Sequence, residues 1–232
     1  MDVIKKAFCL IILQSAVAFW PTTDVERRQI LEAHHRARES VKPPASNMKL
    51  MMYSKKLENL AARWASRCVF EHPDRNTYPE YRELGQNLAL AAGFTPNITE
   101  AACGWRSEIK FYDSVSGRCR HVCGHYTQMI WASSSALGCA MWRCDGVRPD
   151  WHNPQYITAC QYSPPGNYIG SKPYIQGRSC SRCSPGEQCY RNQCARNARH
   201  NQVYPLAKFK SPRYRSLPPC KLPQSYSTFE YG

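Results

Sequence analysis

Long apolar runs and acidic side chains are both scarce in this sequence. Beyond a short apolar run at residues 7–17, no segment approaches the ~18 consecutive apolar residues that a membrane-spanning helix needs. Aspartate and glutamate number 17 against 31 lysines and arginines, so the net charge is +14. The His-Glu-x-x-His pattern of zinc peptidases and the Gly-x-Ser-x-Gly turn of serine hydrolases are also missing. These absences argue against a transmembrane protein and against a hydrolase.

The first residues have the pattern of a secretory signal peptide. A short cationic start at residues 1–6 precedes the apolar run at 7–17, and Ala16-Val17-Ala18 offers the small residues that signal peptidase requires. We expect cleavage after Ala18, which makes residues 1–18 a signal peptide and the protein secreted and extracellular. Cys9 would be removed with it, and the remaining twelve cysteines form an even set suited to an oxidising compartment.

The positive charge is concentrated at the C-terminal end. Residues 170–232 hold eleven lysines and arginines against two acidic residues. From Arg196 onward there is no sustained period of 3.6 or 2, so residues 196–232 are predicted to be a basic, disordered tail. A basic arm outside the cell would meet sulfated glycans or anionic lipid rather than nucleic acid. The simpler alternative is a solubilising tail without a partner.

Asn97-Ile98-Thr99 is an acceptor sequence for N-glycosylation. The residues before it, Gly93 to Asn97, contain glycine, proline and asparagine, which suggests an exposed turn. We therefore expect a glycan on Asn97, in agreement with secretion.

Three segments have the apolar spacing of amphipathic helices. They are residues 24–41, with Asp24 as the expected N-cap, residues 57–68, and residues 99–112, with Thr99 as the capping signal. In the third segment Ala102, Trp105, Ile109 and Tyr112 would form the apolar stripe.

Two short strands follow the helices. Residues 137–142 and 156–162 are rich in strand-forming residues and are bounded by glycine, aspartate, asparagine and proline. The simplest arrangement is an antiparallel pair of neighbours. Helices followed by short antiparallel strands indicate an α+β layered domain rather than a parallel, doubly wound one.

A proline- and glycine-containing run at residues 164–168 ends this domain. Beyond it, Cys180, Cys183, Cys189 and Cys194 stand among serine, proline, glycine and asparagine with almost no apolar residues. Disulfides must supply the stability that such a segment cannot obtain from a core. A zinc site has compatible spacing, but the extracellular compartment favours disulfides.

The densest group of motifs lies between Cys119 and Cys144, which enclose His125, two tryptophans and two further cysteines. The motifs of the whole chain are Gly124-His125-Tyr126-Thr127-Gln128-Met129-Ile130-Trp131, Gly138-Cys139-Ala140, the run from Tyr156 to Tyr168, and the weaker Trp64-Ala65 and Gly85-Gln86-Asn87-Leu88. By these residues the chain resembles the CAP superfamily (cysteine-rich secretory, antigen 5 and pathogenesis-related 1 proteins). The resemblance implies a CAP (SCP) domain at residues 19–169, folded as a three-layer α-β-α sandwich. It also implies a small disulfide-rich hinge at 170–195, as in venom-allergen-like members.

The same resemblance implies a cleft that binds a divalent metal, commonly zinc. The family lines this cleft with two histidines and two acidic residues, which fall here on His72, His125, Glu108 and Gln86. His72 and His125 are the expected metal ligands. Gln86 departs from the family, which usually has glutamate there, and an amide cannot act as a base. The sequence therefore predicts a weakly bound zinc at most and no catalytic residues.

His34 and His35 suggest a second metal site. They are adjacent, so on a helix their side chains point about 100° apart and do not easily face one small site. We expect His34 to lie on the inner face of its helix, near Arg38, in a structural role.

Counting does not determine the disulfide connectivity, but the resemblance and the predicted strands narrow it. Cys103 and Cys220 are left over, and parity alone would pair them. The expected pairs are Cys68 with Cys144, Cys119 with Cys123, Cys139 with Cys160, Cys180 with Cys189, and Cys183 with Cys194.

Lipids are the other ligand class that the resemblance suggests. Some members bind sterols through an aromatic-rich loop before the Gly-His-Tyr-Thr-Gln motif, and others bind fatty acids between two helices. Here that loop, residues 113–122, contains no phenylalanine, tyrosine or tryptophan. Since sterol burial is driven by apolar area, this polar loop weakens the sterol hypothesis. Residues that would line an acyl channel, such as Trp64 and Ile109, fit ordinary core packing better.

Together these patterns predict a secreted, non-enzymatic CAP protein that binds an extracellular protein partner, a lipid or a divalent metal, in defence or host interaction. The first alternative is a secreted hydrolase, metal-dependent or serine-type. The second is a matrix component that binds glycosaminoglycans through its basic tail.

Overall fold

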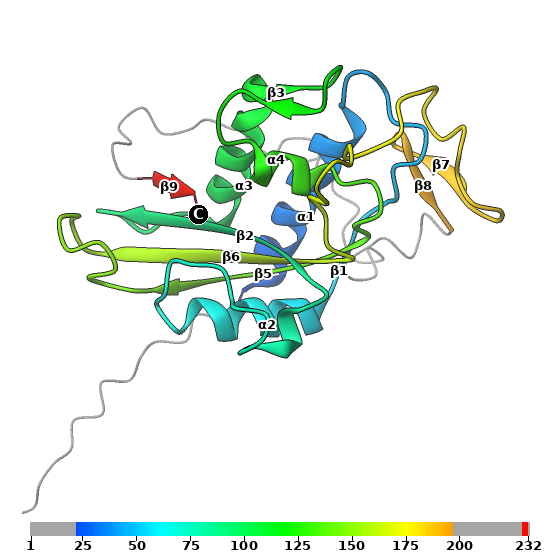
Figure 1. Ribbon diagram of the computed structural model, residues 1–232. Helices are drawn as coiled ribbons and strands as arrows, with labels where there is room; N and C mark the ends of the chain where they lie inside the picture. Colours follow the sequence, from blue (N-terminus) through cyan, green and yellow to red (C-terminus); the bar gives the residue numbers. More distant parts are fainter. Residues whose placement is uncertain (1–21, 197–228, 232) are drawn as a thin grey trace, which may run out of the picture.

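A central sheet lies between one layer of three helices and a second layer of one helix (Figure 1). The computed structural model describes residues 22–196 and 229–231. The predicted three-layer α-β-α sandwich is confirmed. The helices are α1 (Asp24–Glu39), α2 (Lys55–Ala65), α3 (Ile98–Ser107) and α4 (Gly124–Met129), with 3-10 turns η1 (Pro79–Tyr81) and η2 (Glu108–Phe111). None of the helices in the described part of the chain is long and apolar enough to span a membrane.

The five strands of the sheet are ordered β1-β5-β6-β2-β9. β1 runs parallel to β5, and the other neighbours are antiparallel. The two predicted strands are present as β5 and β6 and are antiparallel neighbours, with Cys139 directly opposite Cys160. The strands of this sheet are β1 (Met52–Tyr53), β2 (Gly85–Ala92), β5 (Ala136–Arg143), β6 (Gln155–Ser163) and β9 (Phe229–Tyr231).

Each face of the sheet packs against its own helices because side chains alternate between the faces of a strand. On one face, Leu88, Leu90 and Ile157 pack with the apolar side of α2. On the other face, Ala89 and Tyr162 pack with residues of α1, α3 and α4. Strands buried on both faces do not show a polar and apolar alternation. The sequence pattern therefore does not predict β2 as a strand.

The first helix begins at a different residue from the one predicted. Thr23 is the N-cap of α1, and its hydroxyl accepts a hydrogen bond from the amide of Glu26. The Glu26 carboxylate in turn accepts the Thr23 amide, which completes a capping box. Asp24 is therefore the first helical residue, and its carboxylate accepts a hydrogen bond from Arg27 instead.

The third helix is shorter than predicted at its C-terminal end. Its N-cap is Asn97, whose side chain accepts the amide of Thr99, so the prediction of Thr99 as capping signal is wrong. After Ser107 the chain tightens into η2. A 3-10 turn rotates successive side chains farther than an α-helix does, so the apolar stripe is lost. As a result Ile109 is 48% exposed.

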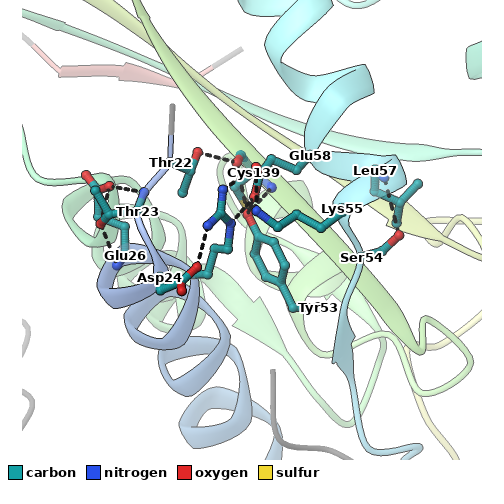
Figure 2. A network of polar contacts seen from close by, with 11 residues as sticks. Thr22, Thr23, Asp24, Glu26, Tyr53, Ser54, Lys55, Leu57, Glu58 and Cys139 are labelled. Atoms are coloured by element: carbon teal, nitrogen blue, oxygen red, sulfur yellow. Dashed lines mark hydrogen bonds and ion pairs between the residues drawn. The ribbon is translucent and has the colours of Figure 1, made fainter. Parts of the chain in front are cut away.

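A buried polar network joins α1 to α2 at one edge of the sheet (Figure 2). The Glu58 carboxylate accepts two hydrogen bonds from Arg27 and one from the Tyr53 hydroxyl, all at 2.6 Å. Lys55 lies 3.6 Å from the same carboxylate, and Thr22 donates to the carbonyl of Cys139 on β5. The network links α1, β1, α2 and β5 by hydrogen bonds that the apolar layers do not provide.

The cysteine-rich segment packs closely against the main domain. Its hairpin consists of β7 (Gln188–Tyr190) and β8 (Gln193–Ala195). At its turn, Arg191 forms ion pairs with Glu32 and Glu39 of α1. The Cys194 amide donates to the carbonyl of Met48. Residues 170–195 are therefore held against α1 and the segment before β1.

Five disulfides are present among the described residues, and they are the pairs that the resemblance and the strand pattern suggested. Cys103 is also disulfide-bonded. Cys220, its proposed partner, lies outside the described residues. The five are Cys68 with Cys144, Cys119 with Cys123, Cys139 with Cys160, Cys180 with Cys189, and Cys183 with Cys194.

The predicted disordered tail contains one ordered element. Residues 229–231 form β9, which pairs antiparallel with β2. The prediction of a disordered tail over 196–232 is therefore wrong for these three residues, because backbone pairing with β2 supplies an order that their sequence pattern does not indicate. The predicted signal peptide and residues 197–228 lie outside the described residues.

Candidate functional site

Glu108 and His125 form the more buried pair of the candidate site. Glu108 begins η2 and His125 lies in α4. Nδ1 of His125 lies 2.7 Å from Oε1 of Glu108, and the Tyr126 amide donates to Oε2 at 3.1 Å. Both side chains are about 6% exposed. The carboxylate thus fixes the imidazole ring and, in the neutral ring, places the proton on Nδ1.

The ring of His125 is also held by stacking. Trp105 of α3 lies nearly parallel to it, with 6.2 Å between the ring centroids and 13° between the planes. The Trp105 indole nitrogen donates to the carbonyl of Leu88 on β2, which fixes the tryptophan in turn. The orientation of His125 is therefore set by two different elements before any ligand binds.

His72 and Gln86 form the second pair. His72 is exposed in the loop between α2 and η1, and Gln86 is the second residue of β2. Nδ1 of His72 lies 2.7 Å from Oε1 of Gln86. Because an amide oxygen can only accept, His72 Nδ1 must donate and Nε2 carries the lone pair. The neutral amide thus orients this ring as Glu108 orients His125, without a negative charge.

Gln86 has an additional feature that the sequence does not indicate. Its register partner on β6 is Gln161, which is completely buried. Nε2 of Gln86 and both amide atoms of Gln161 are buried without a hydrogen-bond partner. Gly138 of β5 lies on the other side of Gln161, and a Cβ there would be 2.1 Å from the amide nitrogen of Glu58 at the start of α2. The missing side chain at Gly138 thus lets α2 approach β5 closely, beside the buried amide of Gln161.

The two pairs meet through neighbouring residues of β2. Asn87, next to Gln86, donates from Nδ2 to the carbonyl of His125 and to the hydroxyl of Tyr162, each at 3.1 Å. The Tyr162 hydroxyl lies 2.8 Å from Nε2 of His34 in α1. The structure therefore brings the four predicted residues into two pairs, His72 with Gln86 and His125 with Glu108. A hydrogen-bonded chain from α1 supports Asn87 on β2.

His34 and His35 are both buried in structural roles. Nδ1 of His34 donates to the carbonyl of Ile30, and His35 contacts the carbonyl of Met51. Burial lowers the pKa of His34 to about 3 and that of His35 to about 4. Both rings are therefore neutral near pH 7. The structural role expected for His34 agrees with this position.

Arg38 is a buried cation whose role the sequence does not show. Its guanidinium donates to the carbonyls of Met129, Trp131, Lys49 and Ala132 at 2.6 to 3.2 Å. Burial lowers its pKa to about 9. It ties the end of α4 to α1 and to the segment before β1. A helical spacing of four residues from His34 is the only sequence signal for its inward direction.

Each of the two histidines has one feature of a histidine that ligates a metal. Each imidazole has its Nδ1 bonded to an oxygen and its Nε2 as donor atom, which is the arrangement of histidine ligands in zinc sites. Among the described residues, the one group of three or more potential ligands whose atoms lie within 4.8 Å of one another is Cys180, Cys183 and Cys194. All three are in disulfides. They are not thiolates and do not compete for zinc.

The loop that binds sterols in some family members is a short hairpin here. Tyr112–Asp113 (β3) pairs with Arg118–Cys119 (β4), and the Cys119–Cys123 disulfide follows. Phe111 and His121 pack edge to face with 4.9 Å between centroids. Val115 and Val122 are exposed. The loop thus offers scattered aliphatic side chains and no ring-lined groove.

The fold, the two histidine pairs and the disulfide pattern define a CAP domain. The chain belongs to the cysteine-rich secretory protein (CAP) family. The model of that family matches residues 31–162. GLIPR1-like protein 1 from Homo sapiens is 40% identical over 171 residues, which are 71% of this chain and 69% of that protein. Peptidase inhibitor 15-A from Danio rerio is 39% identical over 180 residues, 71% of this chain and 68% of that protein. The chain thus spans about two thirds of the length of these relatives.

Solved structures of the same fold include NaASP2 with Zn2+, with a TM-score of 0.61 and 26% identity over 77% of this chain and 99% of that chain. The hookworm platelet inhibitor has a TM-score of 0.60 and 25% identity over 77% of this chain and 94% of that chain. Both agree with the α-β-α arrangement described above.

Proposed function

We propose that this protein is a secreted, non-enzymatic binding protein that holds a divalent metal, most readily zinc, through Nε2 of His72 and of His125. One observation carries the proposal: each of these rings donates from Nδ1 to a side-chain oxygen, Gln86 for one and Glu108 for the other. That contact selects the tautomer with an Nε2 lone pair and orients it before the metal arrives. The related protein NaASP2 has been solved with Zn2+, which supports zinc as the metal.

The same contacts argue against hydrolysis. A metal-bound water needs a nearby base, and Gln86 is neutral at all accessible pH values. Glu108 is the remaining carboxylate, and its two oxygens already accept from His125 and from the Tyr126 amide. With both oxygens engaged, Glu108 supports the histidine ligand and not a proton transfer. The peptidase-inhibitor names of some relatives agree with a binding role towards a protein partner.

Zinc titration of the purified mature protein by calorimetry tests the metal site. His72→Ala removes an exposed ligand without touching the core, and we expect it to weaken zinc binding at least tenfold. His152→Ala, also an exposed histidine, is the matched control and should bind zinc as the wild type does. Equal zinc affinity in wild type and His72→Ala would exclude this site.

The hydrolase alternative needs a separate test. Peptide and ester substrates are incubated with the mature protein with and without zinc. Turnover that disappears in Glu108→Gln would overturn the non-enzymatic proposal, whereas turnover that survives this change points to a contaminating enzyme.

Secretion has its own test. N-terminal sequencing of the secreted protein should give Phe19 as the first residue, and a chain retained in the cell would contradict secretion.

A further inference from the structure

Two glutamines of the central sheet carry buried amide atoms that have no hydrogen-bond partner among the residues the structure describes. In Gln86 of β2 the atom is Nε2, and in Gln161 of β6, which is 0% exposed, both Nε2 and Oε1 are in this state. Folded proteins seldom leave such atoms unpaired, because each one lowers the folding equilibrium constant by about tenfold or more. The two side chains therefore call for a partner.

The nearest candidate partner of each glutamine is the other one. β2 and β6 are antiparallel neighbours (Figure 1), and Gln86 lies directly opposite Gln161. Side chains of directly opposed residues leave the sheet on the same face, with their Cβ atoms about 4.5 to 5.5 Å apart. The terminal torsion of a glutamine, which turns its amide, is soft. The two amides can therefore meet without any movement of the backbone.

The neighbour on the other side of Gln161 does not compete for its amide. That neighbour is Gly138 of β5, which has no side chain. A Cβ there would lie 2.1 Å from the amide nitrogen of Glu58 and 2.5 Å from the carbonyl oxygen of Ser54, so helix backbone fills this space. These two backbone groups are bonded to each other at 2.9 Å. Across the sheet, Gln86 is thus the neighbour with a free amide group.

One arrangement pairs all three of these amide atoms. Oε1 of Gln86 accepts from Nδ1 of His72 at 2.7 Å, and an amide oxygen has a second lone pair. When the two amides lie edge to edge, Nε2 of Gln86 donates to Oε1 of Gln161, and Nε2 of Gln161 donates to Oε1 of Gln86. Two hydrogen bonds then partner every unpaired atom and leave the contact with His72 in place.

We propose that Gln161 is a positioning residue for His72, which it reaches through an edge-to-edge amide pair with Gln86. Gln86 is half-buried and His72 is exposed, so a Gln86 side chain without this anchor turns to water and releases the imidazole ring. The pair holds the Gln86 oxygen against Nδ1 of His72 and thereby keeps the ring proton on Nδ1. The consequence for zinc rests on the proposed function, whereas the amide pair itself does not.

A double-mutant cycle in the metal-free mature protein tests the pair, with urea unfolding at intact disulfides as the measurement. Gln86→Met leaves the fully buried Gln161 without a partner and should lower the folding equilibrium constant about tenfold or more. Gln161→Met should cost less, because the half-buried Gln86 can reach water. The double variant leaves no buried amide and should recover most of the loss. Strictly additive effects would overturn the pairing.

The matched control for the cycle is Gln193→Met. Gln193 of β8 is also 0% exposed and has an unpartnered Oε1, but it belongs to the cysteine-rich segment. Its effect on stability should simply add to that of Gln86→Met. Coupling as strong between Gln193 and Gln86 as between Gln161 and Gln86 would contradict a specific pair.

Nitrogen NMR of the His72 ring in metal-free protein tests the positioning role. At a pH where the imidazole is neutral, the wild type and Gln193→Met should carry the ring proton on Nδ1, and Gln161→Met should move part of it to Nε2. Zinc affinity should fall about tenfold in Gln161→Met, at the lower end of the range for groups that support a ligand. A ring proton that stays on Nδ1 in Gln161→Met would overturn the positioning role. A wild type that shows the coupling and the proton shift but binds no zinc would overturn the proposed function alone.

Discussion

Arg27 and Glu58 form a bidentate ion pair with both contacts at 2.6 Å, although they belong to helices on opposite faces of the sheet. Both side chains are about nine-tenths buried. Burial raises the pKa of the Glu58 carboxyl, but hydrogen bonds from Arg27 and Tyr53 outweigh this and hold the pKa below its usual value. The pair therefore stays charged and ties the two outer layers together around the sheet edge (Figure 2).

Removing one partner of this pair should lower the free energy of unfolding more than replacing both partners. Glu58→Gln leaves the buried Arg27 guanidinium with only the half-exposed Asp24 as a carboxylate partner, and we expect a loss of about 3 kcal/mol of unfolding free energy. Replacing both with apolar residues, Arg27→Met with Glu58→Leu, should recover most of that loss. Urea unfolding with the disulfides intact measures both. If the double variant is as unstable as Glu58→Gln, the instability of Glu58→Gln does not come from the loss of the partner of Arg27.

Mild acid should destabilise the fold through His34 and His35. Their folded pKa values, about 3 and about 4, lie below the value of about 6.5 expected in the unfolded chain. Between about pH 6.5 and pH 4 the unfolded state therefore binds up to two more protons than the folded state, and stability falls as the pH falls. Between pH 7 and pH 5 we expect a loss of roughly 3 to 4 kcal/mol.

Unfolding curves at pH 7, 6 and 5 measure this dependence. His35→Gln should reduce the pH dependence by about half, even if it lowers the stability at pH 7. His152→Ala, which changes an exposed ring, should keep the wild-type dependence. A flat stability between pH 7 and pH 5 would mean that these two rings are not buried as neutral groups.

Restoring a carboxylate at position 86 should strengthen the proposed metal site. Gln86→Glu would accept from the same His72 Nδ1 and add a negative charge near the metal. We expect zinc affinity to rise about 10- to 100-fold, the range by which such supporting groups change affinity. Asn76→Asp, an exposed change in the same loop as His72, is the control for charge alone. Tighter zinc binding in that variant, and none in Gln86→Glu, would contradict the His72 contact.

Glycosylation at Asn97 can be separated from its role as a helix cap. Asn97 is exposed, and its oxygen accepts from the amide and the hydroxyl of Thr99. Asn97→Gln should remove both the glycan and the cap of α3. Thr99→Ala should remove the glycan and keep the bond to the amide. The mass shift on deglycosylation and the thermal midpoint report the two effects, and a wild-type chain without a mass shift would show that the site is not used.

The parts of the fold that the sequence predicts are those with a regular local period. α1, α2, β5 and β6 bury one clear face or a compact apolar run, and the pattern of their segments indicates them. β2 is not predicted because it is buried on both faces, so its sequence does not alternate between polar and apolar residues. It also begins with Gly85, where an added Cβ would overlap the side chain of Gln128. The order of β9 depends on pairing with β2, which no local pattern encodes.

For the candidate site, the resemblance supplies the residues and the structure supplies their partners. The hydrogen bond from His125 to Glu108 spans two elements, and that from His72 to Gln86 joins a loop to a strand. Neither distance follows from sequence spacing. The buried side-chain amide of Gln161, which has no hydrogen-bond partner among the described residues, also cannot be predicted from the sequence, because its surroundings depend on the register of strands across the sheet.

β9 closes the sheet with residues that are made after all its other strands. β2 pairs with β6 on one side and with β9 on the other, where Ala89 lies opposite Tyr231. A ribosome completes β1, β2, β5 and β6 long before residues 229–231 exist. Throughout that interval β2 presents an open edge, the kind of edge that recruits foreign strands. The nascent chain therefore depends on translation passing Tyr231 before this edge is protected.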